Sequence, residues 1–428
     1  MKRSDLDLIG IGIGPFNLSL AALLHKHPEI RSRFFDAKAS FQWHSEVLFK
    51  DSVMQTSWLK DLVTPVDPTS PFSFLNYLVT HGLFYAHLNT DRRTITRREF
   101  ERYCQWVASQ LHDQLSFSTA IQQVEFIDGT FVVRGSAGQF TSRHLCVATG
   151  HVPSTPEFAR PHLGSRVFHA KSPELANIDL RDKRVVIIGG GQTGLEIFRN
   201  ALQEKWGATR ALTLVSRRHT LEPLDETPFT NEYFTPAYVQ NFYQTSRKHK
   251  ESAVAHQRLA SDGNTPFYLN DLFNELYQLR YVERSPKDFR ILARRCVAAL
   301  ESHDETYRLT LENHFTENLE TLDADIVILS TGFKVELPSC LAGIRHLLDL
   351  DESENFRLSE NFQAKWEHQQ TNHLFALNFG RRTHGIAEPQ TSLMAWRSGQ
   401  IANQLLQKSI YSTQSPVANF VTHGSIHG

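Results

Sequence analysis

Two glycine-rich loops are the segments of this sequence whose residue types and spacing indicate a chemistry. The clearer loop has the full G-x-G-x-x-G spacing, with glycines at Gly189, Gly191 and Gly194. A dinucleotide pyrophosphate needs a tight turn, a close backbone approach and free N–H groups at a helix N-terminus. The loop follows an apolar run at 184–188 and opens a helical pattern, so it predicts a dinucleotide site. The predicted contacts are Gly189, Gly191, Gln192, Thr193 and Gly194.

The residues after the next strand-like run indicate which nucleotide binds at this loop. An acidic residue there would bind the ribose 2′-hydroxyl of NAD, whereas arginine suits the 2′-phosphate of NADPH. The run 211–215 is followed by Ser216, Arg217 and Arg218. We therefore predict NADPH, with a solvated arginine pair at a strand end as the alternative interpretation.

The other loop lies near the N-terminus and departs from the usual spacing. Gly10, Gly12 and Gly14 are present, but Pro15 stands where the third glycine would be. Proline is tolerated in the first turn of a helix because its N–H is not needed there. Asp36 ends the following strand and is predicted to accept the ribose hydroxyls. Two nicotinamide sites would have no chemical use, so we predict FAD at this loop and NADPH at the second.

The elements around the loops predict an α/β fold with two Rossmann-like dinucleotide-binding domains, one for FAD and one for NADPH. A third strand is predicted over 324–329, closing on Ser330, Thr331 and Gly332. Residues 221–290 are rich in aromatic and polar side chains and are predicted to form a partly helical insertion that covers the substrate.

The predicted domain division follows these elements. The chain after Ser409 is expected to be loosely ordered. We assign 1–165 and 331–428 to the FAD-binding domain, and 166–330, which contains the 221–290 insertion, to the NADPH-binding domain.

Composition excludes several other classes of protein. The 45 basic residues balance the 46 acidic ones, which leaves no electrostatic footprint for nucleic acid or an anionic membrane. No apolar run reaches the roughly 18 residues that span a bilayer, and no secretory leader is recognised, so cytoplasm is the expected compartment. The four cysteines form no CxxC and the histidines no HExxH, so neither a redox dithiol nor a metal site is predicted.

A series of motifs in a fixed order, from the first strand to about Leu406, resembles the N-hydroxylating flavin monooxygenases. This family contains the lysine, ornithine and diamine N-hydroxylases of siderophore biosynthesis, and the motifs are most similar to its lysine and diamine branch. They are Gly12–Asn17, Trp43-His44, Met54–Leu62, Ser73–Leu78, Ala148–Gly150, Asp225–Phe229 with Asn231–Phe234, Ser330–Phe333 and Thr383–Gln390.

The resemblance implies roles for individual residues. Gln55 is assigned a hydrogen-bonding, catalytic role beside the flavin ring, and Lys60 matches the position that binds the substrate carboxylate. A surface lysine at a helix start is the alternative for Lys60, and core packing is the alternative for Trp43 and His44. The FAD contacts so assigned are Gly10, Gly12, Gly14, Pro15, Phe16, Asn17, Asp36, Trp43, His44, Thr149, Gly150, Thr383, His384 and Gly385. The NADPH contacts added to the second loop are Ser216, Arg217, Arg218, Asn231, Thr331 and Gly332.

The segment around Gly263 departs from the ornithine enzymes, which carry a Thr-Asn-Tyr motif in this stretch. Glycine stands here in place of the tyrosine, which argues against ornithine as the substrate. Asp262 and Asn264 are predicted to face the substrate amine, with a plain loop as the alternative.

The reaction implied by the resemblance is N-hydroxylation, by O₂, of the terminal amine of a small primary amine, with FAD and NADPH, to supply a hydroxylamine for a siderophore. Only a neutral amine can attack oxygen, and at pH 7 about one alkylamine molecule in two thousand is neutral, so the site must lower the pKa of the amine or accept its proton. Lys60 favours L-lysine, whereas Asp67–Pro71 resembles the diamine branch, so cadaverine, putrescine and histamine stay open.

Two further functions and an assembly state complete the expectations. The alternatives are a flavin monooxygenase of the same architecture that acts on sulfur or another soft nucleophile, and an NADPH-dependent flavin reductase. Tetramers are common in the family, so a homo-oligomer is expected.

Overall fold

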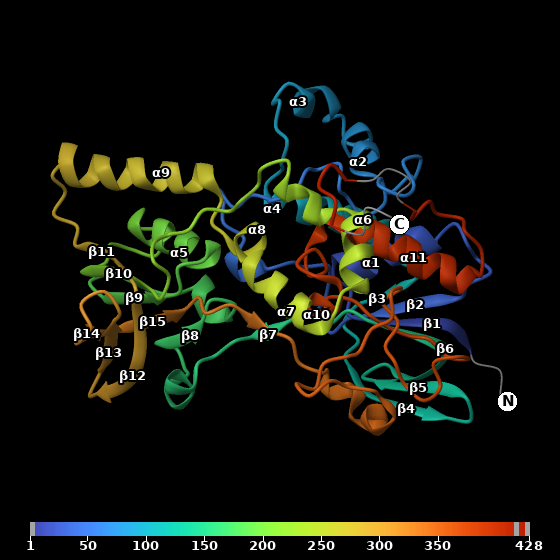
Figure 1. Ribbon diagram of the computed structural model, residues 1–428. Coiled ribbons are helices and arrows are strands. Elements are labelled where there is room, and N and C mark those ends of the chain that lie inside the picture. Colours follow the sequence, from blue (N-terminus) through green and yellow to red (C-terminus); the bar gives the residue numbers. More distant parts are fainter. Residues whose placement is uncertain (1–4, 415–418, 424–428) are drawn as a thin grey trace.

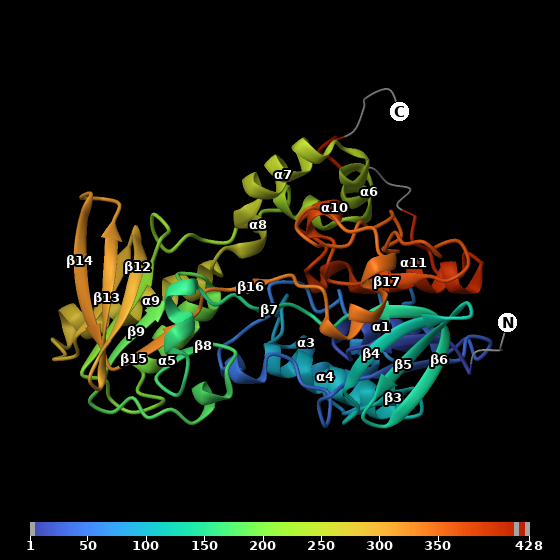
Figure 2. The ribbon, with the colours of Figure 1, turned by 90° about the horizontal axis from the view of Figure 1, so that it is seen from below.

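The computed structural model describes residues 5–414 and 419–423 of the 428-residue chain. Two lobes lie side by side, each built on a mainly parallel sheet, and a short two-stranded ribbon runs between them (Figures 1 and 2). The ribbon pairs β7 (Val152–Pro153) with β16 (Phe333–Lys334). None of the described helices combines the length and apolar character needed to cross a membrane.

The first lobe contains a seven-stranded sheet in which β6 joins two kinds of pairing. Parallel strands run in the order β3-β2-β1-β6, and β6 continues into an antiparallel meander with β5 and β4, while β17 pairs with its last residues. The strands are β1 (Leu6–Ile11), β2 (Ser32–Phe35), β3 (Leu115–Ser116), β4 (Ile121–Ile127), β5 (Thr130–Gly135), β6 (Gly138–Val147) and β17 (Leu374–Ala376).

The second lobe contains a wholly parallel five-stranded sheet in the order β11-β10-β9-β15-β8. Its central strands are runs of valine, isoleucine and leucine, as expected where helices cover both faces of a parallel sheet. The strands are β8 (Val167–His169), β9 (Arg184–Ile188), β10 (Ala211–Ser216), β11 (Phe289–Ala293) and β15 (Ile326–Leu329).

These sheets confirm the predicted fold, including both strand–helix–strand units. They correct the predicted strand over 324–329, because Ala324 ends one strand and β15 begins at Ile326. The chain changes sheets at Asp325, whose backbone and side chain both bond to Arg184. The exact domain boundaries stay a prediction.

A three-stranded antiparallel sheet, which the sequence interpretation did not anticipate, projects from the second lobe (Figure 2). Its strands are β12 (Arg295–His303), β13 (Thr306–Asn313) and β14 (Asn318–Ala324). Its apolar residues pack with those of the parallel sheet in one core cluster. The missed signal was alternation of apolar and polar residues, which is typical of a sheet with one solvated face.

Helices place the site segments of both lobes. In the first lobe they are α1 (Pro15–Leu24), α2 (Phe74–Thr80), α3 (Phe84–Leu88) and α4 (Arg97–Gln110), and α5 (Gln192–Leu202) belongs to the second. The N-terminus of α4 carries a complete capping box between Thr96 and Glu99, which fixes where the helix begins.

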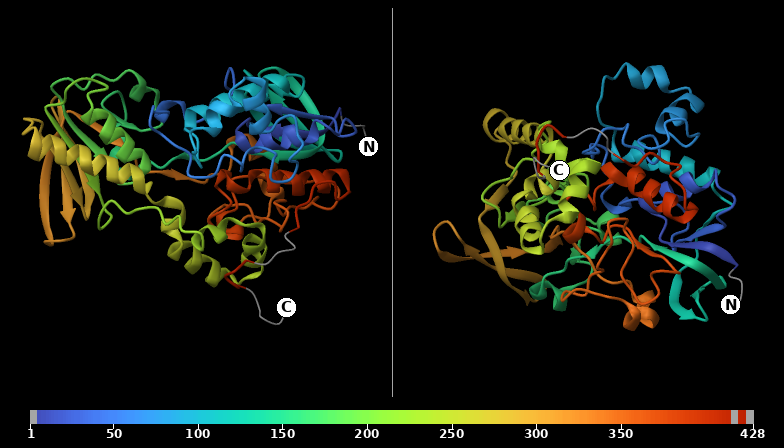
Figure 3. Two further views of the ribbon diagram at one scale, coloured as in Figure 1. Left: turned by 90° about the horizontal axis from the view of Figure 1, so that it is seen from above. Right: turned by 45° about the vertical axis from the view of Figure 1, so that its right-hand side comes forward.

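Most of the predicted 221–290 insertion is helical and contacts both lobes, but its last two residues, Phe289 and Arg290, belong to β11 of the parallel sheet (Figure 3). Its helices are α6 (Pro236–Gln244), α7 (Arg247–His256), α8 (Arg258–Asp262) and α9 (Pro266–Tyr277). The first two pack against α10 (Arg381–His384) of the first lobe. The last pairs Glu275 with Arg199 of α5 at 2.8 Å, so the insertion bridges the lobes.

The C-terminal segment returns to the first lobe and is more firmly packed than expected. Helix α11 (Met394–Leu406) lies against α1. Tyr411 is buried and donates its hydroxyl to Leu23 O at 2.6 Å. Glu232 of the insertion accepts the backbone N–H groups of Phe420 and Val421. The expectation of a loose tail is therefore wrong for these residues; 415–418 and 424–428 lie outside the described residues.

Candidate functional site

The first glycine motif begins two residues later than the sequence suggested, at Gly12 and not at Gly10. Gly12 has a φ of +89° and a Cβ there would meet Ala148 O at 2.6 Å, while Gly14 is the N-cap of α1 and faces open space. In the second loop Gly189 also has a positive φ, of +129°, and Gly191 is likewise the N-cap of its helix. The fingerprint is therefore Gly12-x-Gly14-x-x-Asn17, and Pro15 lies at the first helical position, where its missing N–H costs nothing.

Gly10 and Asn17 consequently have structural positions in this loop. Gly10 belongs to β1, where a Cβ would meet the Phe34 ring at 2.0 Å. Asn17 is fully buried, and its Nδ2 donates to Gly12 O at 2.8 Å. Gly10 thus makes room for a neighbouring strand and Asn17 holds the turn, and the assignment of both as FAD contacts stays a prediction.

Asp36 stabilises the same loop. Its Oδ2 accepts the Ile13 N–H at 2.8 Å, and its Oδ1 accepts the Lys38 N–H at 2.9 Å. Each carboxylate oxygen has a second lone pair, so the predicted contact with ribose hydroxyls is compatible with these bonds and stays a prediction. The open N-terminus of α1 at Gly14 and the acidic strand end together fit an FAD diphosphate and ribose.

The second loop has glycine wherever a side chain could not fit. A Cβ on Gly189 would meet Ser330 O at 2.1 Å, and one on Gly194 would meet Gly189 O at 1.9 Å. A Cβ on Gly191 would meet nothing closer than 3.9 Å, which leaves the helix N-terminus open to a phosphate. The arrangement fits a second dinucleotide pyrophosphate at α5.

The two arginines after β10 differ in their surroundings. Arg217 is exposed and takes part in no ion pair within 5–414 and 419–423. Arg218 is half-buried: it lies 3.6 Å from Glu222, donates Nη2 to Asp262 O at 2.9 Å, and its buried Nη1 has no partner among the described residues. Ser216 is buried and accepts the Arg218 N–H, so its side chain shapes the turn.

Gln55 and Lys60 lie on a segment that runs antiparallel to 92–97. Backbone bonds join Met54 N–H to Ile95 O at 2.8 Å and Trp58 N–H to Arg93 O at 3.3 Å. We call residues 52–60 the site strip. Gln55 Nε2 reaches Thr265 Oγ1 at 3.4 Å, so the strip touches the start of α9.

The Lys60 ammonium is half-buried and takes part in no ion pair within the part of the chain that the structure describes. Burial, together with the nearby Arg93 guanidinium, lowers the pKa of Lys60. The sequence interpretation missed Arg93, which is 33 positions away and carries no motif of its own. Two neighbouring positive charges without an ion-pair partner favour the binding of an anionic group at this place. Lys60 lies in a turn, not at a helix start.

Trp43 and His44 pack at the edge of the core. Trp43 meets the Phe100 ring edge-on at 5.1 Å, and His44 lies 6.2 Å from Phe333, ring to ring. Burial lowers the pKa of His44 to about 3, so this imidazole is neutral at pH 7. The core packing that was the alternative for Trp43 is what the structure shows; a contact with FAD stays untested.

The strand-end turns at Thr149-Gly150 and Thr331-Gly332 lie between the lobes, at the two ends of the β7–β16 ribbon. Both glycines have a φ near +80° and open space where a Cβ would be. Thr331 donates its hydroxyl to Ser154 O at 2.6 Å. Their assignments to FAD and NADPH stay predictions.

The Thr383-His384-Gly385 segment is internally bonded. His384 is buried, stacks on Phe362 at 4.4 Å, and uses its ring nitrogens with Thr383 Oγ1 and Glu360 O. Burial lowers its pKa to about 3. These contacts engage both ring nitrogens of His384 with protein groups, and the predicted contact of Thr383, His384 and Gly385 with FAD stays untested. Phe16 is buried under the Arg397 guanidinium, which lies 4.3 Å above its ring.

The polar residues predicted to touch substrate are engaged with protein groups. The Asp262 carboxylate binds Arg381 at 2.8 Å. Asn264 is fully buried, and its Nδ2 lies 3.1 Å from both Gly190 O and Glu222 O, so it braces the second glycine loop. Asn231 donates to Glu226 O within its own turn. Substrate contact by Asp262 and Asn264 stays untested, as does NADPH contact by Asn231.

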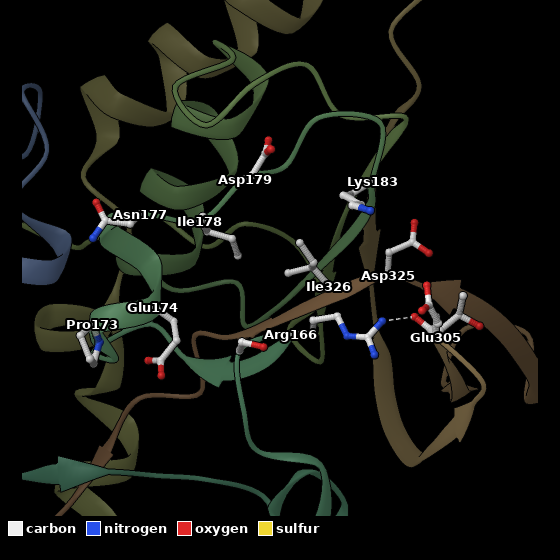
Figure 4. A pocket seen from close by; sticks show the side chains of 12 residues that line it. Arg166, Pro173, Glu174, Asn177, Ile178, Asp179, Lys183, Glu305, Asp325 and Ile326 are labelled. Carbon is white, nitrogen blue, oxygen red and sulfur yellow. Dashed lines mark hydrogen bonds between the residues drawn. The ribbon is translucent and has the colours of Figure 1, made fainter.

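A cavity of about 610 Å³ lies at the other end of the second lobe (Figure 4). Its lining includes Arg166, Lys183 and Asp325, which immediately precede β8, β9 and β15. Nucleotides bind at the carboxyl ends of parallel strands, so this cavity at the amino ends is not the dinucleotide site.

One group of residues with metal-ligand chemistry occurs in the described part of the chain. Cys296, Glu312 and His314 bring their ligand atoms within 4.8 Å of one another on β12, β13 and the turn that follows. Glu312 and His314 are exposed and belong to the three-stranded sheet, away from both glycine loops. The absence of a metal from the site stays a prediction.

Comparison with known proteins identifies relatives over the whole chain. A family profile described as L-lysine 6-monooxygenase/L-ornithine 5-monooxygenase matches residues 4–335. The L-lysine N6-monooxygenase of Escherichia coli is 39% identical over 98% of both chains. A putrescine N-hydroxylase from Shewanella oneidensis is 30% identical over 98% of this chain and 84% of its own.

A solved relative carries both cofactors. The ornithine N-hydroxylase of Kutzneria sp. 744, determined with reduced FAD, NADP⁺ and L-ornithine, superposes with a TM-score of 0.86. It is 25% identical over 94% of this chain and 99% of that one.

Proposed function

Since this chain belongs to the L-lysine 6-monooxygenase/L-ornithine 5-monooxygenase family, we propose that its substrate is L-lysine, which it hydroxylates at N6 with FAD, NADPH and O₂. The reaction class and both cofactors are those of the family, and the choice of amine is the part proposed. The hydroxylamine product would supply siderophore biosynthesis.

One observation carries the choice of an amino acid. The half-buried Lys60 ammonium and the nearby exposed Arg93 guanidinium form no ion pair with the described residues, and burial together with the Arg93 charge lowers the pKa of Lys60. A diamine would add another cation to this site, whereas the α-carboxylate of lysine supplies an anion that pairs with both. The 39% identity to the lysine enzyme supports the same choice.

The chain's own residues would bind, orient and shield the substrate. When bound and reduced by NADPH, FAD supplies the oxygen-transfer chemistry with O₂. Lys60 would hold the carboxylate at one end of the extended substrate, and Gln55, five residues earlier on the site strip, would lie toward the reacting end. The substrate amine must be neutral to react, and desolvation between the lobes would favour that form.

The test is a substrate panel on the wild-type enzyme and on Lys60→Met, which keeps the length of the side chain and removes its charge. Hydroxylated products of L-lysine, L-ornithine, cadaverine, putrescine and histamine are measured by mass spectrometry. A charge-assisted contact contributes about 1.5–3 kcal/mol, so KM for lysine should rise tenfold or more in the variant. Turnover of cadaverine should not decrease.

Lys50→Met, a change at an exposed lysine ten positions earlier, is the matched control and should leave all KM values unchanged. A wild-type preference for cadaverine or putrescine over lysine would refute the substrate and leave the family's reaction intact. A KM for lysine that is insensitive to Lys60→Met would refute the role of Lys60.

A further inference from the structure

Glu196 is a buried carboxylate at the boundary between the two lobes. It lies in α5, two residues after the last glycine of the second loop, and its side chain is completely inaccessible to solvent. It accepts hydrogen bonds from Ser52 Oγ at 2.9 Å, Arg97 Nη1 at 3.2 Å and Gln192 Nε2 at 2.9 Å. The segments around Ser52 and Arg97 and the start of α5, which are distant in sequence, are therefore all bonded to the same carboxylate.

Two of these partners belong to the site strip and the segment beside it. The Arg97 N–H donates to Ser52 O at 2.9 Å, and the same two residues both bind Glu196. Ser52 begins the strip that continues to Gln55 and Lys60. Glu196 is thus anchored at the point where the first lobe's two antiparallel segments start their pairing.

The third partner belongs to the NADPH-binding loop. Gln192 is the first residue of α5, directly after the N-cap Gly191. Its Oε1 accepts the Thr265 N–H at 2.8 Å, and Thr265 Oγ1 in turn accepts from Gln55 Nε2 at 3.4 Å. Two hydrogen-bonded connections therefore join the second loop to the site strip, one through Glu196 and one through Thr265.

Stability alone does not account for a charge in this place. Burying a carboxylate and a guanidinium costs several kcal/mol per ion, and an apolar pair of similar volume is often as stable. What the Glu196–Arg97 ion pair adds is a single geometry, because a shift of either segment leaves the buried Glu196 carboxylate without its cation.

We propose that Glu196 is a positioning residue for hydride transfer: through Ser52, Arg97 and Gln192 it holds the NADPH-binding loop in fixed register with the site strip. The hydride carries two electrons from NADPH to FAD, and Glu196 neither gives nor takes a proton in that step. The proposal rests on the family's use of FAD and NADPH and not on lysine as the substrate.

The experiment separates positioning from folding with a double variant. Glu196→Gln leaves the Arg97 charge unpaired and Arg97→Met leaves the Glu196 charge unpaired, so each single variant should have a lower Tm. The double variant removes both charges, and its Tm should recover much of the decrease. In the double variant, flavin reduction at saturating NADPH, measured by anaerobic stopped flow without any amine, should be slowed tenfold or more. The Kd for NADP⁺ should change less than about threefold, because the loop that binds phosphate is intact.

Hydrogen exchange of the holoenzyme gives a readout that is independent of turnover. Peptides that cover 52–60 and 189–196 should both exchange faster in the double variant. Asp325→Asn is the matched control, because Asp325 pairs with Arg184 at 2.8 Å inside the second lobe. It should lower Tm and leave both peptides and the reduction rate unchanged.

Wild-type flavin reduction in the double variant would overturn the proposal. So would a reduction rate that follows Tm across all four variants, Asp325→Asn included, or faster exchange in only one of the two peptides. A preference for another amine would not affect any of these measurements.

Discussion

Removing Arg217 should weaken the binding of NADPH and leave the binding of NADH almost unchanged. This arginine follows β10, is exposed, and has no ionic partner in the described residues, so its guanidinium is available to a 2′-phosphate. One charge-assisted bond contributes about 1.5–3 kcal/mol. Because an exposed guanidinium is partly screened by solvent, the lower end applies, and KM for NADPH should rise about tenfold in Arg217→Ala.

Arg218→Ala should behave differently, because Arg218 also supports the protein. Its loss removes the bond to Asp262 O and the contact with Glu222. The start of the insertion should loosen, and KM should rise for both NADPH and NADH, with a lower Tm. This separates two neighbouring arginines that the sequence treats as a pair.

The assay is steady-state oxidation of NADPH and NADH at low and high salt, with Arg210→Ala as the control. Arg210 forms an exposed ion pair with Asp182 just before β10, at the end away from the glycine loop. Its removal should change neither KM. If Arg217→Ala weakens NADPH and NADH equally, the arginine does not read the 2′-phosphate and the reasoning is refuted.

Two further predictions concern the second loop and the acid side of the stability profile. In Gly194→Ala the new methyl group would lie 1.9 Å from Gly189 O, and the relaxation needed to relieve this contact should cost about 1–3 kcal/mol. The variant should therefore bind NADP⁺ more weakly in a calorimetric titration, whereas Gly164→Ala, where the Cβ has open space, should not. Equal affinity in both variants would contradict the packing role of Gly194. Because burial lowers the pKa of His384 to about 3, the unfolded chain binds a proton that the folded chain does not between pH 6.5 and 3, and stability falls as pH falls. At pH 5.5 this amounts to about 1 kcal/mol, which His384→Gln should remove from the difference between urea unfolding at pH 7.5 and at pH 5.5. An unchanged difference would show that His384 does not contribute to the acid destabilisation.

The sequence by itself determined the second glycine loop and the strands that precede both loops, while the order of the two cofactors along the chain stays a prediction. These features are local. A glycine with positive φ, an open N-cap and a buried run of valine and isoleucine each follow from a few adjacent residues. The spacing of Gly189, Gly191 and Gly194 could therefore be recognised, and the structure gives Gly189 and Gly194 a steric reason, while Gly191 leaves the helix N-terminus open.

The first loop is a case in which the local sequence pattern does not predict the position of the turn. Gly10 and Gly12 have the right spacing, but β1 continues through Gly10 to Ile11 because its backbone pairs with β2 and β6. Strand pairing moved the turn by two residues, so that Asn17 and not Pro15 occupies the position of the third glycine. The residues of the loop do not specify how far the neighbouring strands β2 and β6 extend, and that extent decides where β1 ends.

Only the tertiary structure decided which charges are paired. Lys60 and Arg93, Glu196 and Arg97, and Asp262 and Arg381 are each separated by tens of residues, and which segments meet decides whether a charge is neutralised, buried or left for a ligand. Periodicity reports the backbone's local geometry. The partner of a side chain depends on the packing of distant segments, because hydrogen bonds and ion pairs act over a few ångströms in space, whatever the separation along the chain.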